Sequence, residues 1–253
     1  MENTDYNKSL FEIYKNHWPS LRRALEGMGT VTLKLSYPLM MHVFPGYEKA
    51  NPRLLVVGQE TYGWGFNGKA DYLGSSIWDD SIEKLDEHGS VEQLVRELTG
   101  LYEGFKMAEN YYSVPFWRAI HELHRRLNPN CPKHGFLWTN LIKVSQSKRR
   151  PSPKIERIVC DSFPVLLLEI KAICPDVVVF FTGPLYDSRL EKTFDGLSMD
   201  QVNRYAKRHF SRLIHKGLPE NSFRTYHPGY FQRSGKLDDL HRIIDRIVKL
   251  SHI

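Results

Sequence analysis

The chain has 253 residues, of which 41% are hydrophobic and 25% are charged, and its formal net charge at pH 7 is +6. This composition is that of a globular protein large enough to bury a real core. Its longest apolar runs, such as residues 177–181, are far too short to cross a membrane. The net positive charge is compatible with a polyanionic partner but does not prove one.

The cysteines, two histidines and the first residues indicate the cellular compartment and whether the protein binds a metal. The three cysteines are scattered, which excludes a disulfide framework and a Cys-x-x-Cys metal pair. His121 and His124 stand three residues apart without a third ligand in sight, so we expect no metal. The first residues show no signal-peptide pattern. We therefore expect a cytoplasmic protein.

The first half of the chain alternates between helical and strand patterns. An amphipathic helix is predicted over about residues 6–28, where Pro19 could kink or split it. Residues 54–57 form a short apolar run that is typical of a buried parallel strand. Residues 59–80, rich in glycine and aromatic residues, predict a long functional loop. Two helices are predicted to follow, over about residues 90–104 and 111–127.

The second half continues this alternation. Further strands are predicted over residues 136–142, 176–181 and about 222–226, a long helix over residues 155–173, and a closing helix over residues 237–250. Residues 145–153 and 185–215 are polar and mixed. The pattern predicts an α/β fold with three layers, α/β/α, around a central, mainly parallel four-stranded sheet. We expect one domain that spans residues 1–253.

Titratable residues follow the first and the last predicted strand. Glu60 follows the first after Gly58 and Gln59, and His227 comes directly after the last. In open α/β sheets the ligand crevice lies outside the carboxyl ends of the strands. A carboxylate and a histidine that meet there indicate general acid/base or charge-stabilising chemistry.

Four strand-end motifs, taken in order, resemble those of the uracil-DNA glycosylase-like superfamily. The first motif is Gly58-Gln59-Glu60-Thr61-Tyr62-Gly63, which is similar to Gly-Gln-Asp-Pro-Tyr-His in the best-known branch. The others are Thr139-Asn140-Leu141-Ile142-Lys143, the strand and turn at residues 178–183, and His227-Pro228-Gly229-Tyr230. The resemblance covers roughly residues 50 to 250.

This resemblance implies hydrolysis of the N-glycosidic bond of an extruded uracil or related damaged base in DNA. Glu60 falls on the position of the catalytic carboxylate, which stabilises an oxocarbenium-like sugar or orients water. His227 falls on the position that stabilises the departing base anion by hydrogen bonding. The chain has Glu where the motif has Asp, and Thr61 and Gly63 replace Pro and His. Each of these side chains could instead have only a structural role.

The resemblance also implies the residues that bind the base. Gln59 falls on a base-contact position and Tyr62 on the residue that screens the pocket against bulkier bases. Asn140 falls on the base-reading position, because its amide both donates and accepts hydrogen bonds. Phe66 is our candidate for the ring that stacks on the base, although the sequence does not choose between it and other aromatic residues of the same loop.

Basic residues near the predicted strand ends are candidates for DNA contact. One basic cluster consists of Lys148, Arg149 and Arg150. A second cluster, with Arg204, Lys207, Arg208 and Arg212, precedes the last strand. Either cluster could simply be a solvated face. We expect DNA as the partner, a monomer, no membrane association and no cofactor or metal. The candidate DNA-binding residues are Lys143, Lys148, Arg149, Arg150, Arg224, Tyr230 and Arg233.

Two rival functions remain open. A protein of the same fold could bind nucleic acid or a nucleotide without hydrolysis, and the substitutions in the first motif favour that alternative. A different hydrolase could use the crevice for a small ligand.

Overall fold

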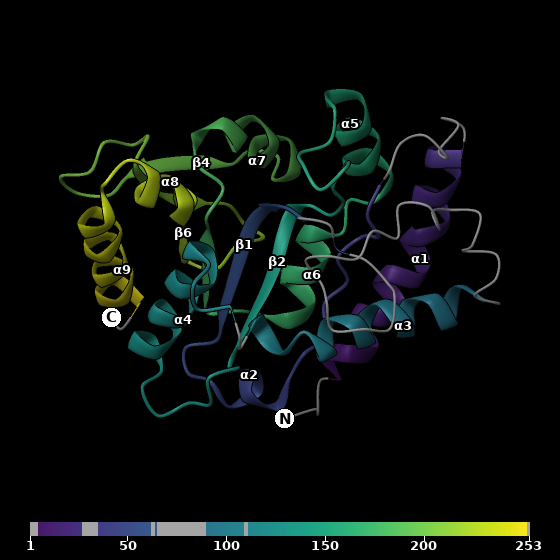
Figure 1. The fold of residues 1–253 in the computed structure, drawn as a ribbon, viewed down its shortest axis with the longest axis horizontal. Helices are drawn as coiled ribbons and strands as arrows, with labels where there is room; N and C mark the ends of the chain where they lie inside the picture. Colours follow the sequence, from purple (N-terminus) through teal and green to yellow (C-terminus); the bar gives the residue numbers. More distant parts are fainter. Residues whose placement is uncertain (1–4, 27–34, 62–63, 65–89, 109–110, 252–253) are drawn as a thin grey trace. The chain divides into compact units, whose positions relative to one another are not determined.

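A single mixed sheet organises the strands of this α/β protein. The computed structural model describes residues 5–26, 35–61, 64, 90–108 and 111–251. Within these residues, six strands form a sheet with the order β2-β1-β3-β6-β5-β4 (Figure 1). The strands are β1 (Leu54–Glu60), β2 (Phe136–Ile142), β3 (Val177–Phe180), β4 (Ser198–Gln201), β5 (Phe210–Ile214) and β6 (Asn221–Thr225).

The four strands that the sequence predicts are confirmed as β1, β2, β3 and β6, and they are neighbours in the sheet. β1 pairs with β3 and β3 pairs with β6, both in parallel. Val57 lies opposite Phe180, and Phe180 lies opposite Arg224, so these three strands end at the same edge. The apolar residues of β1 and β3 are fully buried, as expected for the centre of a parallel sheet.

The prediction of a four-stranded, mainly parallel sheet is confirmed only in part, because the sheet has six strands and is mixed. β5 pairs antiparallel with β6, and β4 pairs antiparallel with β5, which makes the sheet mixed. Both extra strands come from the segment that reads as polar and mixed. β4 has only four residues and none of them is buried, so it lacks the alternation that predicts a strand. Short, polar strands are usual at the edge of a sheet, where they discourage pairing with other chains.

The chain divides into two compact units, each assembled from three segments. Unit 1 comprises Met1–His42, Glu60–Phe105 and Thr139–Ile173, and unit 2 comprises Val43–Gln59, Lys106–Trp138 and Cys174–Ile253. That the whole chain forms one domain stays a prediction.

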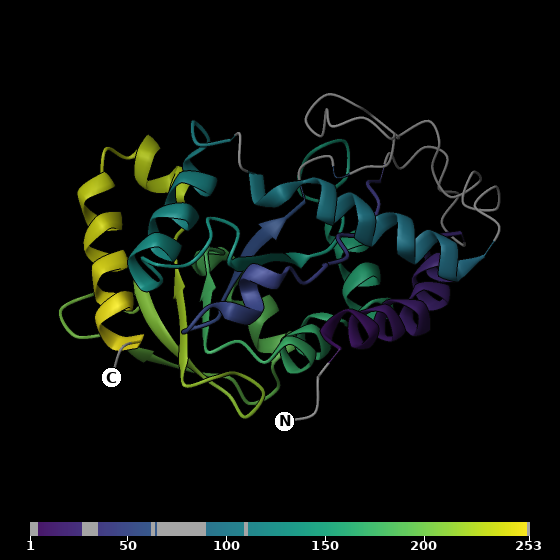
Figure 2. The same cartoon turned by 90° about the horizontal axis from the view of Figure 1, so that it is seen from below.

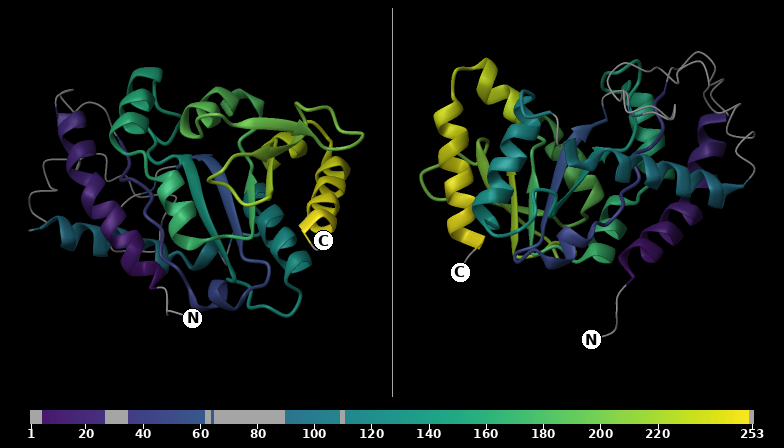
Figure 3. Two further views of the ribbon diagram at one scale, coloured as in Figure 1. Left: turned by 180° about the vertical axis from the view of Figure 1, so that it is seen from behind. Right: turned by 60° about the horizontal axis from the view of Figure 1, so that its bottom comes forward.

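In unit 1, helix α1 (Tyr6–Glu26) packs against α3 (Val91–Gly104), α5 (Pro153–Ser162) and α6 (Leu166–Ile173) (Figure 3). α1 runs without a break through Pro19. Its apolar residues recur at helical spacing and are buried, which explains why this amphipathic segment packs as a helix. These residues are Leu10, Tyr14, Trp18, Leu21 and Leu25.

The long helix predicted over residues 155–173 is two helices, α5 and α6. α5 ends at Ser162, and Phe163 leaves helical geometry with φ −134° and ψ 58°. The next residue is Pro164, whose ring disfavours helical geometry in the residue before it. Proline therefore separates two segments whose apolar patterns run together in the sequence.

In unit 2, three helices pack together, namely α4 (Pro115–Leu127), α8 (Pro228–Arg233) and α9 (Leu237–Ser251), and α9 also contacts β6 (Figure 2). α9 buries Leu240, Ile243, Ile244 and Ile247 along one side. The unit also contains α2 (Pro45–Lys49), α7 (Asp187–Thr193) and two single turns, η4 (Lys106–Ala108) and η5 (Pro184–Tyr186). No helix in the described ranges combines the length and the apolar character needed to cross a membrane.

Candidate functional site

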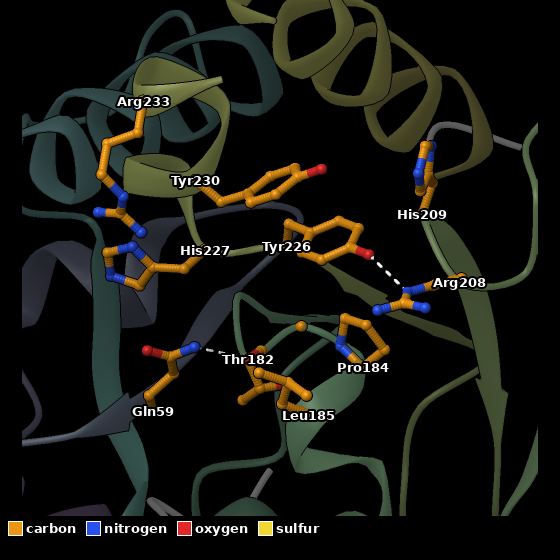
Figure 4. Close-up of a pocket in the computed structure, with 11 residues that line it drawn as sticks. Gln59, Thr182, Pro184, Leu185, Arg208, His209, Tyr226, His227, Tyr230 and Arg233 are labelled. Carbon is orange, nitrogen blue, oxygen red and sulfur yellow. Dashed lines mark hydrogen bonds between the residues drawn. The ribbon is translucent and has the colours of Figure 1, made fainter. Parts of the chain in front are cut away.

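A cavity of about 660 Å³ lies in unit 2 beside the carboxyl ends of β1, β3 and β6. The strand ends are held together there. The N–H of Phe181 donates to the carbonyl of Val57 at 2.9 Å, and the N–H of Gly183 donates to the carbonyl of Thr225 at 2.9 Å. The residues around the cavity are Gln59, Thr182, Gly183, Pro184, Leu185, Arg208, His209, Tyr226, His227, Tyr230 and Arg233 (Figure 4).

His227 caps the N-terminus of α8 in a way that fixes its tautomer. The backbone N–H of Gly229 donates to Nδ1 of His227 at 3.1 Å. A neutral imidazole that accepts at Nδ1 carries its proton on Nε2. His227 therefore offers an N–H donor rather than an acceptor at Nε2.

The surroundings of His227 keep the ring neutral. Phe116 of α4 stacks on it in parallel, with ring centroids 5.2 Å apart and planes 6° apart. Burial, and then the positive charge of Arg233, lower the pKa of His227 to about 4. The residue lines the cavity and is only partly buried there.

Gln59 links two strand ends. Its Nε2 donates to the carbonyl of Thr182 at 2.7 Å, so a side chain near the end of β1 is anchored on the chain just after β3 (Figure 4). Both residues line the cavity. The cavity thus brings together Gln59 and His227, two residues that the resemblance places at the site.

Stacked aromatic rings form another wall of the cavity. Tyr226 and Tyr230 lie nearly parallel, with centroids 4.1 Å apart and planes 17° apart. Nε of Arg208 donates to the hydroxyl of Tyr226 at 2.9 Å (Figure 4). Leu185 is 73% exposed and gives the cavity an apolar rim.

Sequence reasoning missed several residues of this cavity. Arg208 and His209 reach it because β5 pairs with β6 in a register that sets Phe210 opposite Thr225. Because β5 was not predicted, the approach of Arg208 and His209 to the cavity could not be predicted either. The basic cluster around residue 208 was a signal, but nothing in the sequence tied it to the strand-end motifs.

The catalytic carboxylate and the base-reading amide of the prediction belong to unit 1. Glu60 is the last residue of β1 and is partly exposed, and Asn140 lies within β2 and is 1% exposed. That these two side chains converge with His227 stays a prediction. Tyr62 and Phe66 lie outside the described residues.

Lys143 is buried, which corrects its predicted role in DNA binding. It is 2% exposed, and its Nζ donates to Oε2 of Glu169 and to the hydroxyl of Thr139. Oε1 of Glu169 accepts from the hydroxyl of Tyr14 at 2.8 Å. Burial lowers the pKa of Lys143, while the charge of Glu169 acts against that shift. An ammonium enclosed in this way cannot reach a phosphate.

Arg224 is also buried, and its predicted contact with DNA is corrected for the same reason. It is 1% exposed, and its Nη2 donates to Oδ2 of Asp187 at 2.9 Å. Its Nη1 donates to the carbonyl of Arg208 at 2.8 Å. The guanidinium therefore stabilises the interior of unit 2 through its hydrogen bonds to Asp187 and to the carbonyl of Arg208.

The other predicted DNA contacts lie nearer the surface. Lys148, Arg149 and Arg150 belong to a turn of unit 1 in which the N–H of Arg149 donates to the carbonyl of Gln146 at 2.9 Å. Arg150 pairs with Glu156 at 3.3 Å. Arg233 and Tyr230 line the cavity of unit 2. Contact of these residues with DNA stays a prediction.

Comparison of the chain with protein-family models, with curated proteins and with solved structures gives no match. Within the part of the chain that the structure describes, no group of three or more His, Cys, Asp or Glu side chains could hold a metal ion.

Proposed function

We propose that the protein is a monofunctional DNA glycosylase of the uracil-DNA glycosylase-like superfamily, which removes an extruded uracil or a related damaged base. The observation that carries the proposal is the state of His227, a neutral imidazole with an N–H donor at a cavity beside the carboxyl ends of three parallel strands. The three-layer architecture and the monomeric, cytoplasmic state expected from the sequence belong to the same proposal.

The chemistry follows from the charge that develops during cleavage. The bond between the base nitrogen and C1′ of the sugar breaks, and its electron pair leaves with the base. A neutral N–H donor stabilises the resulting anion by hydrogen bonding. A ring with a pKa of about 4 keeps this form at neutral pH, because it has no tendency to take up a second proton there.

Other residues complete the reaction in this proposal. The carboxylate of Glu60 stabilises the cationic sugar and orients the water that adds to C1′, and the proton of that water ends on the base. Gln59 and Asn140 hydrogen-bond to the edges of the base. The products are the free base and an abasic site.

The test is single-turnover cleavage of a uracil-containing oligonucleotide, read out as strand breakage after alkali. His227→Ala removes the donor and should slow cleavage on the order of 100- to 1,000-fold. His215→Ala is the matched control, since Nδ1 of His215 also accepts an N–H two residues on, from Gly217 at 3.0 Å, but does not line the cavity. Cleavage that survives His227→Ala at the wild-type rate would remove the basis of the proposal.

One observation favours a second candidate, a module that binds nucleic acid without hydrolysing it. Of the described residues that line the cavity, none is Asp or Glu, whereas Arg208, Arg233 and two stacked tyrosines are present. Such a set suits a nucleotide as a ligand, because aromatic rings stack on bases and arginine pairs with phosphate. Wild-type protein that binds DNA but cleaves no modified base would support this candidate.

A further inference from the structure

The loop between β4 and β5 carries an uninterrupted basic charge. No Asp or Glu occurs between Asp200 and Glu220, whereas this stretch contains five lysines and arginines. Three of them, Arg204, Lys207 and Arg208, belong to the loop of residues 202–209 and are exposed. We call these three residues the basic arm. Neither the strand-end motifs nor the proposed chemistry uses them.

The basic arm adjoins the cavity through Arg208. This side chain lines the cavity and donates to the hydroxyl of Tyr226, which stacks on Tyr230 (Figure 4). The bond to Tyr226 uses Nε, and the two Nη groups of the guanidinium are separate donors. Positive charge and aromatic rings therefore meet at one end of the same cavity that His227 lines.

The backbone of the loop is fixed to the sheet at three successive carbonyls. The carbonyl of Arg208 accepts from Nη1 of the buried Arg224 at 2.8 Å, and that of His209 accepts from the hydroxyl of Thr225 at 2.9 Å. The carbonyl of Lys207 accepts from the hydroxyl of Ser211. A loop that is held in this way loses little conformational entropy when it binds a ligand.

Asp187, an acidic group that interacts electrostatically with the arm, is already paired with Arg224. Burial raises the pKa of Asp187, while the charge of Arg224 and, to a smaller extent, that of Lys207 act against this shift. The carboxylate of Asp187 accepts from Arg224 at 2.9 Å. Its charge is therefore balanced inside unit 2, and the charge of the arm remains available to an anion.

We propose that the basic arm, Arg204, Lys207 and Arg208, binds the phosphodiester backbone of a nucleic-acid strand next to the nucleotide whose base enters the cavity. The inference rests on the proposed function only for the identity of that base. It adds a phosphate-binding surface on the antiparallel extension of the sheet, and it gives Arg224 the role of holding that surface in place. The two Nη groups of Arg208 suit the two oxygens of a phosphodiester.

Binding of a short uracil-free oligonucleotide, measured by fluorescence anisotropy over a salt series, tests the arm without any cleavage. The triple variant Arg204→Gln/Lys207→Gln/Arg208→Gln should bind more weakly at low salt. Each lost phosphate contact lowers the slope of log K against log salt by about 0.7 to 0.9, so the slope should fall by about 2 to 3. The matched control is Arg125→Gln/Arg246→Gln/Lys249→Gln, which removes the same charges from α4 and α9, away from the cavity lining.

The outcomes separate the arm from the proposed function. A reduced slope in the arm variant but not in the control supports the arm, even if the wild type cleaves no uracil-containing DNA and the proposed function fails. An unchanged slope in a folded arm variant, or an equal loss in the control, overturns it, even if the wild type is an active glycosylase. Displacement of the oligonucleotide by a mononucleotide at equal phosphate concentration would overturn the assignment to a strand and indicate a free nucleotide instead.

Discussion

Gly229 donates its backbone N–H to Nδ1 of His227 at 3.1 Å, and this bond determines which nitrogen of the ring carries the proton. It also leaves little room beside the ring. A Cβ added at Gly229 would lie 3.1 Å from Nδ1 of His227 and 3.1 Å from Nη1 of Arg233. A glycine at this position thus lets the histidine and the arginine approach the same turn of α8.

The first prediction concerns the titration of His227. Because its pKa is lowered from 6.5 to about 4, the unfolded chain binds a proton at this site at a higher pH than the folded chain. The free energy of unfolding should therefore decrease as the pH falls from about 6.5 to about 4, by on the order of 3 kcal/mol from this residue.

Two measurements check this prediction. Urea denaturation at several pH values should show that the free energy of unfolding depends less on pH in His227→Gln than in wild type and in the control His215→Gln. NMR titration of the folded protein should give His227 a pKa near 4. A normal pKa near 6.5 would contradict both the burial argument and the neutral-donor role.

The second prediction concerns the ring that covers His227. Phe116→Ala removes the parallel stacking partner and opens the imidazole to water. Because burial is the main cause of the lowered pKa, the pKa of His227 should rise towards 6.5. The control is Phe194→Ala, which removes a ring that contacts His215 instead, with centroids 5.5 Å apart.

The readout is again NMR titration, carried out on variants that still unfold cooperatively. In Phe116→Ala, cleavage at pH 6 should fall more than cleavage at pH 8, because part of the histidine is then protonated. Equal loss at both pH values would mean that Phe116 acts only through packing.

The third prediction concerns the buried ion pair of unit 1. Lys143→Met leaves the carboxylate of Glu169 buried beside the hydroxyl groups of Thr139 and Tyr14, without the charge that balances it. Removal of one partner from a buried pair costs about 3 to 5 kcal/mol. The double variant Lys143→Met/Glu169→Leu removes both charges and should recover much of that loss. Urea denaturation of the two single variants and the double variant measures the coupling.

An exposed pair provides the comparison. Nζ of Lys15 lies 3.0 Å from Oε1 of Glu92, and both side chains are more than one-third exposed. Lys15→Met should hardly change the denaturation midpoint, because water and salt screen such pairs. If Lys143→Met behaved like Lys15→Met, the enclosed position of Lys143 would be in doubt.

The sequence predicts the central strands well because their signal is local. The first four residues of β1 and all of β3 are uninterrupted apolar runs. Parallel strands end at a shared edge, so residues near those ends, such as Gln59 and His227, lie at the same edge of the sheet. β4 was not predicted because it is a polar edge strand without a buried residue, and β5 was not predicted because Ser211 and Arg212 interrupt its apolar residues. The approach to the cavity of Arg208 and His209, which lie in the loop between these two strands, was missed for the same reason.

The prediction that Lys143 contacts DNA was wrong for a different reason. A lysine at the end of a strand ordinarily reaches water, and nothing near it in the sequence indicates otherwise. Its partner Glu169 is 26 residues away, in a helix whose other polar residues read as solvated. Burial of this pair depends on how α1 and α6 pack inside unit 1, which no local pattern encodes. Charge alone therefore did not distinguish a DNA contact from a core ion pair.

The last prediction concerns the carboxylate assigned to the sugar. Glu60→Gln keeps the shape of a partly exposed side chain at the end of β1 and removes its charge. If the proposed function holds, single-turnover cleavage should slow while the affinity for uracil-containing DNA stays within a few-fold of wild type, because the charge acts mainly when the sugar becomes cationic. The matched control is Glu48→Gln on α2, which is exposed and lies outside the described cavity lining. Wild-type cleavage in Glu60→Gln together with slow cleavage in His227→Ala would keep the reaction but assign the sugar cation to another group. Loss of DNA affinity in Glu60→Gln without a change in the cleavage step would instead make Glu60 a binding residue.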